Sequence, residues 1–170
     1  MFIKISPRTS ASHKFLTAML ITYTLLGEHG IFHFMLAQIE RSLPALDSTS
    51  AIQHRIALFA SALESHADIE DELLFNALEL HLGAQGGPLF VMRMEHDQIK
   101  ELLGRIESAT DPDSARALAK QMIQVTREHF QKEEQILFRM AHQFLGEDEL
   151  ASLGAEWAQR RAPLIGLDTP

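Results

Sequence analysis

Apolar residues recur along most of the chain at alternating steps of three and four, the spacing that places side chains on one face of an α-helix. Proline or glycine interrupts this pattern at three places: around Pro44, at 83–88 and at 110–112. The pattern therefore predicts four long helices within residues 11–144, over 11–43, 51–82, 88–109 and 112–144. A shorter fifth helix is predicted over residues 147–160.

The connections between the predicted long helices are short, so neighbouring helices should run antiparallel. The expected fold is all-α, an up-down-up-down four-helix bundle with a short C-terminal helix packed on its end. With 170 residues, 46% of them apolar, the chain can bury a sizeable core, and we expect residues 1–170 to form one domain. Two helix starts carry local signals: Ser50 followed by Gln53 resembles a capping box, and Asp111 is a good N-cap before a proline.

Each predicted long helix carries polar residues inside its apolar stripe. The stripe of the fourth helix, for example, continues past positions 129 and 133 to Ile136 and Met140. The inward-facing polar residues of the four helices are His29, His66, Glu70, His96, His129 and Glu133. Counted along antiparallel helices, all of them fall within roughly one helical turn of the same level, so their side chains can meet in one layer of the core.

These residues belong to an internal repeat. A Glu-His pair occurs in the first and in the third helix, at Glu28-His29 and at Glu95-His96. The second and fourth helices carry related segments, HADIEDELLF and HFQKEEQILF, each with a glutamate four residues after the histidine and Leu-Phe at the end. The chain therefore contains two related helix pairs that face each other.

A buried set of imidazoles and carboxylates calls for a cation. Burying charged groups without compensation costs several kcal/mol per group, and no Lys or Arg lies in the same stripes. Cysteine is absent, so the ligand atoms must be nitrogen and oxygen. Imidazole with carboxylate suits iron, manganese or zinc, whereas calcium prefers an all-oxygen site.

The spacing of the ligands favours two ions over one. His66 and Glu70 lie on the same helix face about one turn apart, as do His129 and Glu133, so each glutamate can bridge to a second metal beyond its own histidine. Two six-coordinate ions have about twelve positions, of which these side chains would fill about eight. A solvent-derived oxo or hydroxo bridge would use about two more, which leaves room for small ligands.

The order and spacing of the six residues resemble those of the hemerythrin-like, or HHE cation-binding, domain over about residues 11–144. The resemblance implies a di-iron centre that interacts with oxygen, nitric oxide or peroxide, or that senses oxygen or iron. Classical oxygen-carrying hemerythrins have a fifth histidine one turn after the third-helix ligand, where this chain has Lys100. The internal repeat makes His33 the counterpart of Lys100 and therefore a candidate for the missing ligand. Some hemerythrins use a carboxylate five residues after the histidine, which makes Glu134 an alternative to Glu133.

Other titratable residues have ordinary interpretations. Glu28 and Glu95 lie about 100° around their helices from the adjacent histidines, which favours salt bridges or support of the ligands over metal binding. Asp71 and Glu134 are expected to face solvent. Four further histidines are expected at the surface or at helix ends: His13, His54, His81 and His142.

Charge and hydropathy argue against two classes of partner. The formal charge of -8, with no cluster of Lys and Arg, argues against nucleic-acid binding. The apolar run over residues 15–26 is too short to span a bilayer, and no small-residue cleavage site follows it, so neither a membrane anchor nor a signal peptide is expected. Together with the absence of cysteine, this predicts a cytoplasmic protein.

The residues and the resemblance lead to one main hypothesis and one alternative. The main hypothesis is a non-haem di-iron protein that binds or senses a small diatomic ligand or peroxide at its open metal positions. The alternative is a metal-responsive regulatory or iron-storage module without gas chemistry. Whether the protein is an enzyme stays open, because the sequence shows no separate substrate pocket or proton relay. The oligomeric state and any redox partner also stay open.

Overall fold

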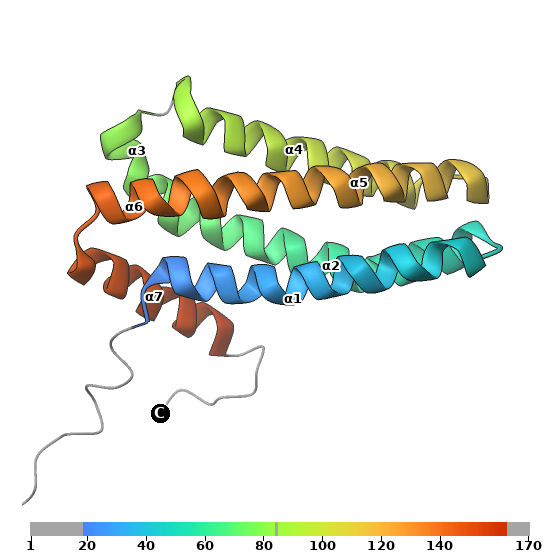
Figure 1. Ribbon diagram of the computed structural model, residues 1–170, viewed down its shortest axis with the longest axis horizontal. Coiled ribbons are helices and arrows are strands. Elements are labelled where there is room, and N and C mark those ends of the chain that lie inside the picture. The colour runs from blue at the N-terminus through green and yellow to red at the C-terminus, as the bar shows by residue number, and fades with distance from the viewer. Residues whose placement is uncertain (1–18, 84, 163–170) are drawn as a thin grey trace, which may run out of the picture.

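The computed structural model describes residues 19–83 and 85–162, and over these residues the fold is all-α, as predicted. The helices are α1 (Ile21–Ser42), α2 (Thr49–Glu70), α3 (Asn76–Leu82), α4 (Gly87–Glu107), α5 (Pro112–Lys132), α6 (Phe138–Phe144) and α7 (Glu147–Arg161). A short 3₁₀ turn, η1 (Leu43–Ala45), follows α1. Four long rods, α1, α2 with α3, α4, and α5 with α6, pack side by side in up-down-up-down order (Figure 1). Helix α7 packs against α1 near one end of this bundle.

Two of the rods contain a π-helical turn where a bundle helix continues into a second segment. Such a turn, η2 (Asp71–Phe75), joins α2 to α3, and another, η3 (Glu133–Leu137), joins α5 to α6. A π turn holds one residue more than an α turn, so every side chain beyond it moves by one position around the helix.

This shift corrects the predicted stripe of the fourth rod. Ile136 was expected to face the core, but its side chain is 53% exposed, and Met140 is only partly buried. Leu137 and Ala141, one position later in each case, are buried instead. The prediction was wrong because it continued an uninterrupted α-helical period through η3.

The first rod is shorter than predicted. The helix begins at Ile21, with Leu20 in an extended conformation, and residues 11–18 of the predicted helix lie outside the described residues. The start of α1 is packed against α7 at Gly154, where an added Cβ would meet the carbonyl oxygen of Met19 at 1.8 Å. This close approach needs the extended backbone before α1.

One predicted helix cap is confirmed and the other is wrong. The side chain of Asp111 accepts a hydrogen bond from the Ser114 backbone N–H at 2.8 Å, as expected of an N-cap. The second helix is capped by Ser48, not by Ser50, because it starts two residues earlier than predicted. Gln53 therefore takes no part in capping this helix. Its side-chain amide instead donates to backbone carbonyls at the end of α4, including that of Glu107 at 2.8 Å.

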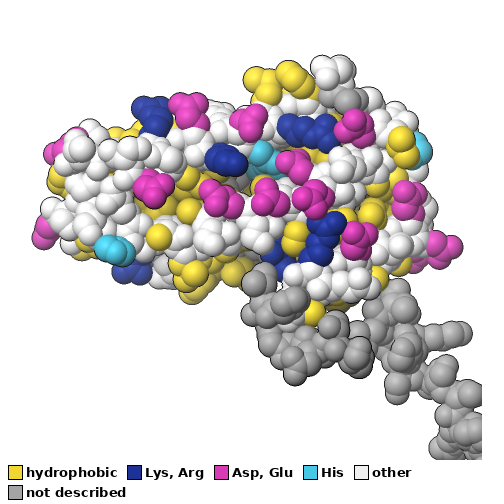
Figure 2. All heavy atoms as spheres, turned by 180° about the vertical axis from the view of Figure 1, so that it is seen from behind, with side chains coloured by type: hydrophobic (Ala, Val, Ile, Leu, Met, Phe, Trp, Pro, Cys, Tyr) yellow, Lys and Arg dark blue, Asp and Glu magenta, His cyan; other side chains and the backbone are white. Residues whose placement is uncertain are grey.

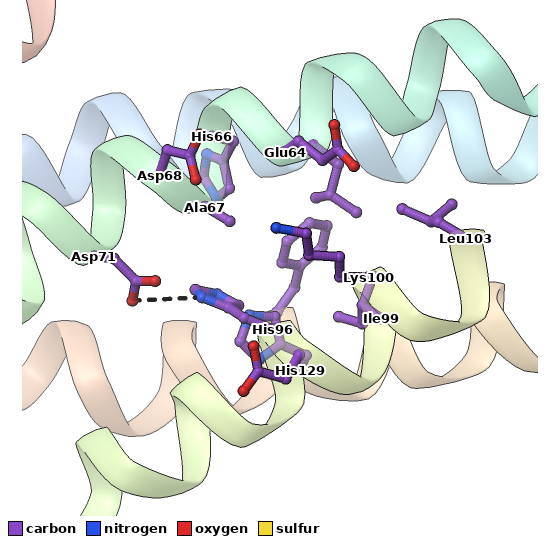
Figure 3. A pocket seen from close by; sticks show the side chains of 13 residues that line it. Glu64, His66, Ala67, Asp68, Asp71, His96, Ile99, Lys100, Leu103 and His129 are labelled. Carbon is purple, nitrogen blue, oxygen red and sulfur yellow. Dashed lines mark ion pairs between the residues drawn. The ribbon is translucent and has the colours of Figure 1, made fainter. Parts of the chain in front are cut away.

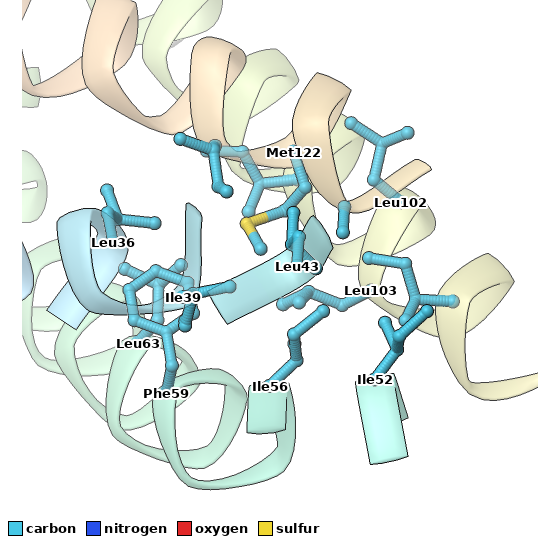
Figure 4. Packing of buried hydrophobic residues seen from close by; sticks show 14 of the residues in the cluster. Leu36, Ile39, Leu43, Ile52, Ile56, Phe59, Leu63, Leu102, Leu103 and Met122 are labelled. Carbon is cyan, nitrogen blue, oxygen red and sulfur yellow. The ribbon is translucent and has the colours of Figure 1, made fainter. Parts of the chain in front are cut away.

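The core consists of two apolar clusters separated by a polar layer. One cluster packs Phe32, Phe59 and Met122 with aliphatic neighbours toward the α1–α2 turn (Figure 4). The other includes Leu25 and Phe75 and lies toward α7. The inward-facing histidines and glutamates lie between these clusters on every rod, and all but His96 are buried. None of the helices in the described part of the chain is long and apolar enough to cross a membrane.

Candidate metal centre

The structure brings all six predicted polar residues into one layer of the core. His29 comes from α1, His66 and Glu70 from α2, His96 from α4, His129 from α5, and Glu133 from the first position of η3. Five of the side chains are buried, and that of His96 is 11% exposed. Among the described residues they form two groups that share both glutamates: His29, His66, Glu70 and Glu133, and Glu70, His96, His129 and Glu133.

Distances within these groups suit metal ligands. Glu133 Oε2 lies 3.4 Å from His29 Nε2, and Glu133 Oε1 lies 3.0 Å from His129 Nε2. Glu70 Oε2 lies 3.7 Å from His66 Nε2 and equally far from His96 Nε2. Ligand atoms at right angles about 2.1 Å from one ion are about 3 Å apart, so small side-chain movements would complete both sites.

Each of the four histidines has a carboxylate on its outer side that faces Nδ1. The pairs are His29 with Glu134 at 3.0 Å, His66 with Glu28 at 2.7 Å, His96 with Asp71 at 3.5 Å, and His129 with Glu95 at 3.1 Å. For His29, His66 and His129 this distance is that of a hydrogen bond, and because a carboxylate can only accept one, Nδ1 carries the proton. When such a ring is neutral, the lone pair of Nε2 points into the layer. That tautomer is the one a metal ligand needs.

The pairing follows the internal repeat. Glu28 and Glu95 precede a histidine of one rod and bind the histidine of the next, so the structure agrees with their expected role beside the ligands. Asp71 and Glu134 follow the shared glutamates and bind the histidines of the other half (Figure 3 for Asp71).

The prediction that Asp71 and Glu134 face solvent was only partly right. Both are partly exposed, but each turns toward a histidine. Both stand in π turns, where the smaller rotation per residue keeps a side chain closer in direction to its predecessor. In the sequence, both repeated segments have an acidic residue directly after the inward-facing glutamate, and this shared feature could have indicated a role for Asp71 and Glu134.

His33 does not join either group. Its side chain is 42% exposed and its Nε2 lies 3.8 Å from Glu134 Oε1. Glu134 itself lies on the outer side of His29, whereas both oxygens of Glu133 are buried inside the layer. His54 is bonded to Ser50 at the start of α2, and His13 lies outside the described residues.

The two shared glutamates lack hydrogen-bond partners. All four of their carboxylate oxygens are buried and unpaired within the described structure. Burial and the neighbouring charge of Glu133 raise the pKa of Glu70 well above its ordinary value. Burial also acts to raise the pKa of Glu133, but the positive charge of His129, whose Nε2 lies 3.0 Å from Glu133 Oε1, outweighs it and lowers that pKa well below the ordinary range.

The histidines are perturbed in opposite directions. Burial lowers the pKa of His29 to about 3, which keeps its imidazole neutral and able to act as a ligand. Burial also acts to lower the pKa of His96, but the neighbouring carboxylates of Asp71 and Glu133 outweigh it and raise that pKa to about 9. Without a cation, the layer thus relies on protons to compensate its buried carboxylates.

A pocket of about 230 Å³ opens between α2 and α4 and reaches this layer. His66, His96 and His129 line its inner end, and Lys100 extends across it from α4 (Figure 3). Its outer lining is acidic and includes Glu64. The face formed by α2 and α4 carries acidic and basic side chains around a visible histidine (Figure 2).

Fold and site together define a class of protein, a four-helix bundle whose buried His and Glu side chains could bind metal cations. The hemerythrin HHE cation binding domain family matches residues 20–141, and the chain belongs to this family. No curated protein and no solved structure matches the chain significantly. Helix α7 lies beyond the matched residues.

Proposed function

We propose that this protein is a non-haem di-iron protein that binds or senses oxygen, nitric oxide or peroxide. One ion would be held by His29, His66, Glu70 and Glu133, and the other by Glu70, His96, His129 and Glu133. The bound irons would supply the change of redox state and the open positions for a small ligand.

The observation that carries the proposal is the set of unpaired carboxylate oxygens. Glu70 and Glu133 are fully buried, and none of their four oxygens has a hydrogen-bond partner among the described residues. Buried polar atoms are almost always satisfied, and an unpaired buried carboxylate is strongly destabilising. Two cations between the glutamates would compensate all four oxygens at once.

The histidines support the same conclusion independently. His29 Nε2 and His66 Nε2 are only 3.2 Å apart, and the Nδ1 atom of each faces a carboxylate. When both rings are neutral with their protons on Nδ1, neither Nε2 can donate to the other, so two lone pairs face each other. A cation coordinated by both nitrogens removes this repulsion. Nitrogen and oxygen donors without thiolate suit iron, and manganese or zinc would fit the same atoms.

The pocket supports binding of a small molecule beside the ions. Its volume of about 230 Å³ is several times the roughly 30 Å³ that one water occupies, which is room for a diatomic molecule or a peroxide. Lys100 replaces the fifth histidine of the classical carriers and offers an ammonium donor in the pocket instead of a ligand. His33 lies outside both groups, so the protein supplies fewer nitrogens than a classical carrier. A sensor or scavenger is therefore better supported than a reversible oxygen carrier.

Metal analysis followed by optical titration tests the proposal. Protein purified without added metal should contain close to two irons per chain. Addition of oxygen or nitric oxide to the reduced, iron-loaded protein should produce a charge-transfer band or shift an existing one. If neither gas changes the spectrum, the proposed ligand chemistry fails, and if the bound metal is zinc or manganese, the assignment to iron fails.

A metal-responsive regulatory or storage module is the second candidate. All four long helices contribute a side chain to the layer, so ions bound there would join helices that the two core clusters otherwise hold by apolar packing. This arrangement favours the second candidate. This candidate predicts an apo form that loses its helical structure well below the melting temperature of the loaded form, with little response to either gas. Thermal melts with and without iron distinguish the two candidates.

A further inference from the structure

Arg161, the last residue of α7, reaches the outer side of the candidate centre. Its Nε donates to Glu28 Oε1 at 2.7 Å, and its Nη2 donates to Glu28 Oε2 at 3.2 Å. The remaining nitrogen, Nη1, donates to Ser65 Oγ at 2.6 Å. Glu28 Oε2 in turn accepts the Nδ1 proton of His66 at 2.7 Å. A continuous chain of short hydrogen bonds therefore runs from α7 to a proposed metal ligand.

We infer that Arg161 is a positioning residue for the ion held by His29 and His66. It fixes the plane and location of the Glu28 carboxylate, which fixes the imidazole of His66 through its Nδ1 proton. The inference rests on the proposed function and adds to it a role for α7, which lies beyond the residues matched by the family.

The guanidinium is held firmly enough for this role. Its side chain is 11% exposed, and all three nitrogens donate hydrogen bonds. A planar guanidinium that donates to both oxygens of a carboxylate fixes the orientation of the carboxylate and also compensates its charge. The neighbouring Arg160 pairs with Glu72 in η2, so a second contact of α7 lies just beyond Glu70. Close packing of Gly154 against Met19 keeps the whole helix on α1.

Among the described residues, no arginine holds a carboxylate of the other half at hydrogen-bond distance, since Arg93 Nε approaches Asp71 Oδ1 only to 4.0 Å. Glu95, the counterpart of Glu28, pairs with Lys132, which belongs to the same helix as His129 and is 43% exposed. A flexible ammonium supplies charge but does not fix the plane of a carboxylate. Because of the repeat, the two ion positions have similar ligands. They differ in the residue that holds the supporting glutamate, which is Arg161 of α7 for Glu28 and Lys132 for Glu95. The His29–His66 position should therefore depend on Arg161, and the His96–His129 position should not.

Zinc titration of the full-length chain tests this inference, with R161Q as the main variant. Competition with a chelator should show that R161Q binds one of its two zinc equivalents about 10- to 100-fold more weakly than the wild type. R161K keeps a charge without the planar fork and should stay closer to R161Q than to the wild type. K132Q is the matched control in the other half, and its two affinities should change by no more than a few-fold.

Proton NMR of the zinc-loaded proteins gives a readout that a merely structural role would not move selectively. The Nδ1–H resonance of His66 should shift in R161Q, while those of His96 and His129 stay in place. Unchanged zinc affinity together with an unchanged His66 resonance would overturn the inference. So would equal weakening of both equivalents in proportion to a lower melting temperature of apo R161Q. If the wild-type chain itself binds neither zinc nor iron(II), the proposed function fails first.

Discussion

Replacing Glu70 with methionine should have opposite effects on the metal-free protein and on metal binding. Methionine has a similar length and an unbranched shape, but no oxygen atoms. The variant therefore removes two buried, unpaired oxygens from the apo protein and one shared ligand from both proposed ion positions. We expect apo E70M to be more stable than the apo wild type and to bind neither ion tightly.

The magnitude follows from the burial of the carboxylate. Glu70 is fully buried next to Glu133, and replacement of poorly compensated buried charges by apolar groups of similar volume is commonly stabilising by about 1–4 kcal/mol. For a chain of this size, each kcal/mol shifts the melting temperature by about 2–4 °C, so apo E70M should melt roughly 4–8 °C higher if the gain is near 2 kcal/mol. Metal at about 100 times its dissociation constant stabilises by about 2.7 kcal/mol per site, and E70M should lack this gain.

The pH dependence sharpens the test. Because the pKa of Glu70 is raised in the folded state, the folded protein holds this proton at pH values where the unfolded chain has released it. The free energy of unfolding of the apo wild type should therefore fall, relative to E70M, as pH rises above the ordinary carboxyl pKa toward the raised one. Urea unfolding of both apo proteins at several pH values measures the difference, with E64M on the exposed face of α2 as control. An apo E70M that is less stable than the wild type at neutral pH would refute the reasoning.

Three further predictions concern the ligands, the packing of α7 and the protons of the layer. His66→Ala and His129→Ala should each lose about one metal equivalent while His54→Ala loses none, and equal metal content in all three would contradict the assignment. Gly154→Ala should lower the free energy of unfolding by about 1–3 kcal/mol in denaturant titrations, because its Cβ meets the backbone, whereas Gly104→Ala in open space should be neutral or slightly stabilising. Metal binding at neutral pH should release protons, since the layer holds them in the apo form, so the calorimetric heat should vary with the ionisation enthalpy of the buffer. A heat that is independent of the buffer would contradict this last prediction.

The polar layer could be predicted from the sequence because the pattern that indicates it is local and occurs twice. A histidine followed four residues later by glutamate, inside an apolar stripe, identifies inward-facing positions on a helix without knowledge of its neighbours. The structure places these six side chains in two groups, and within each group the possible ligand atoms lie within 4.8 Å of one another. Their burial was predictable for the same reason.

The carboxylates around the layer could be predicted from the sequence only in part. Glu28 and Glu95 stand out through the repeated Glu-His pairs, although their partners are histidines on other helices. Asp71 and Glu134 were assigned to solvent because an α-helical period was continued through what are π turns. Ile136 was misplaced for the same reason.

The sequence by itself determined the four-helix architecture, the level of the polar layer and the six residues within it, because helical periodicity and short connections are local properties. Only the tertiary structure decided which carboxylate holds which histidine, where the helices widen into π turns, and that Arg161 reaches Glu28. These features depend on the distance and rotation between helices far apart in the chain, and no local pattern encodes them. The dependence of the His29–His66 position on Arg161 thus arises from packing between the two ends of the described chain.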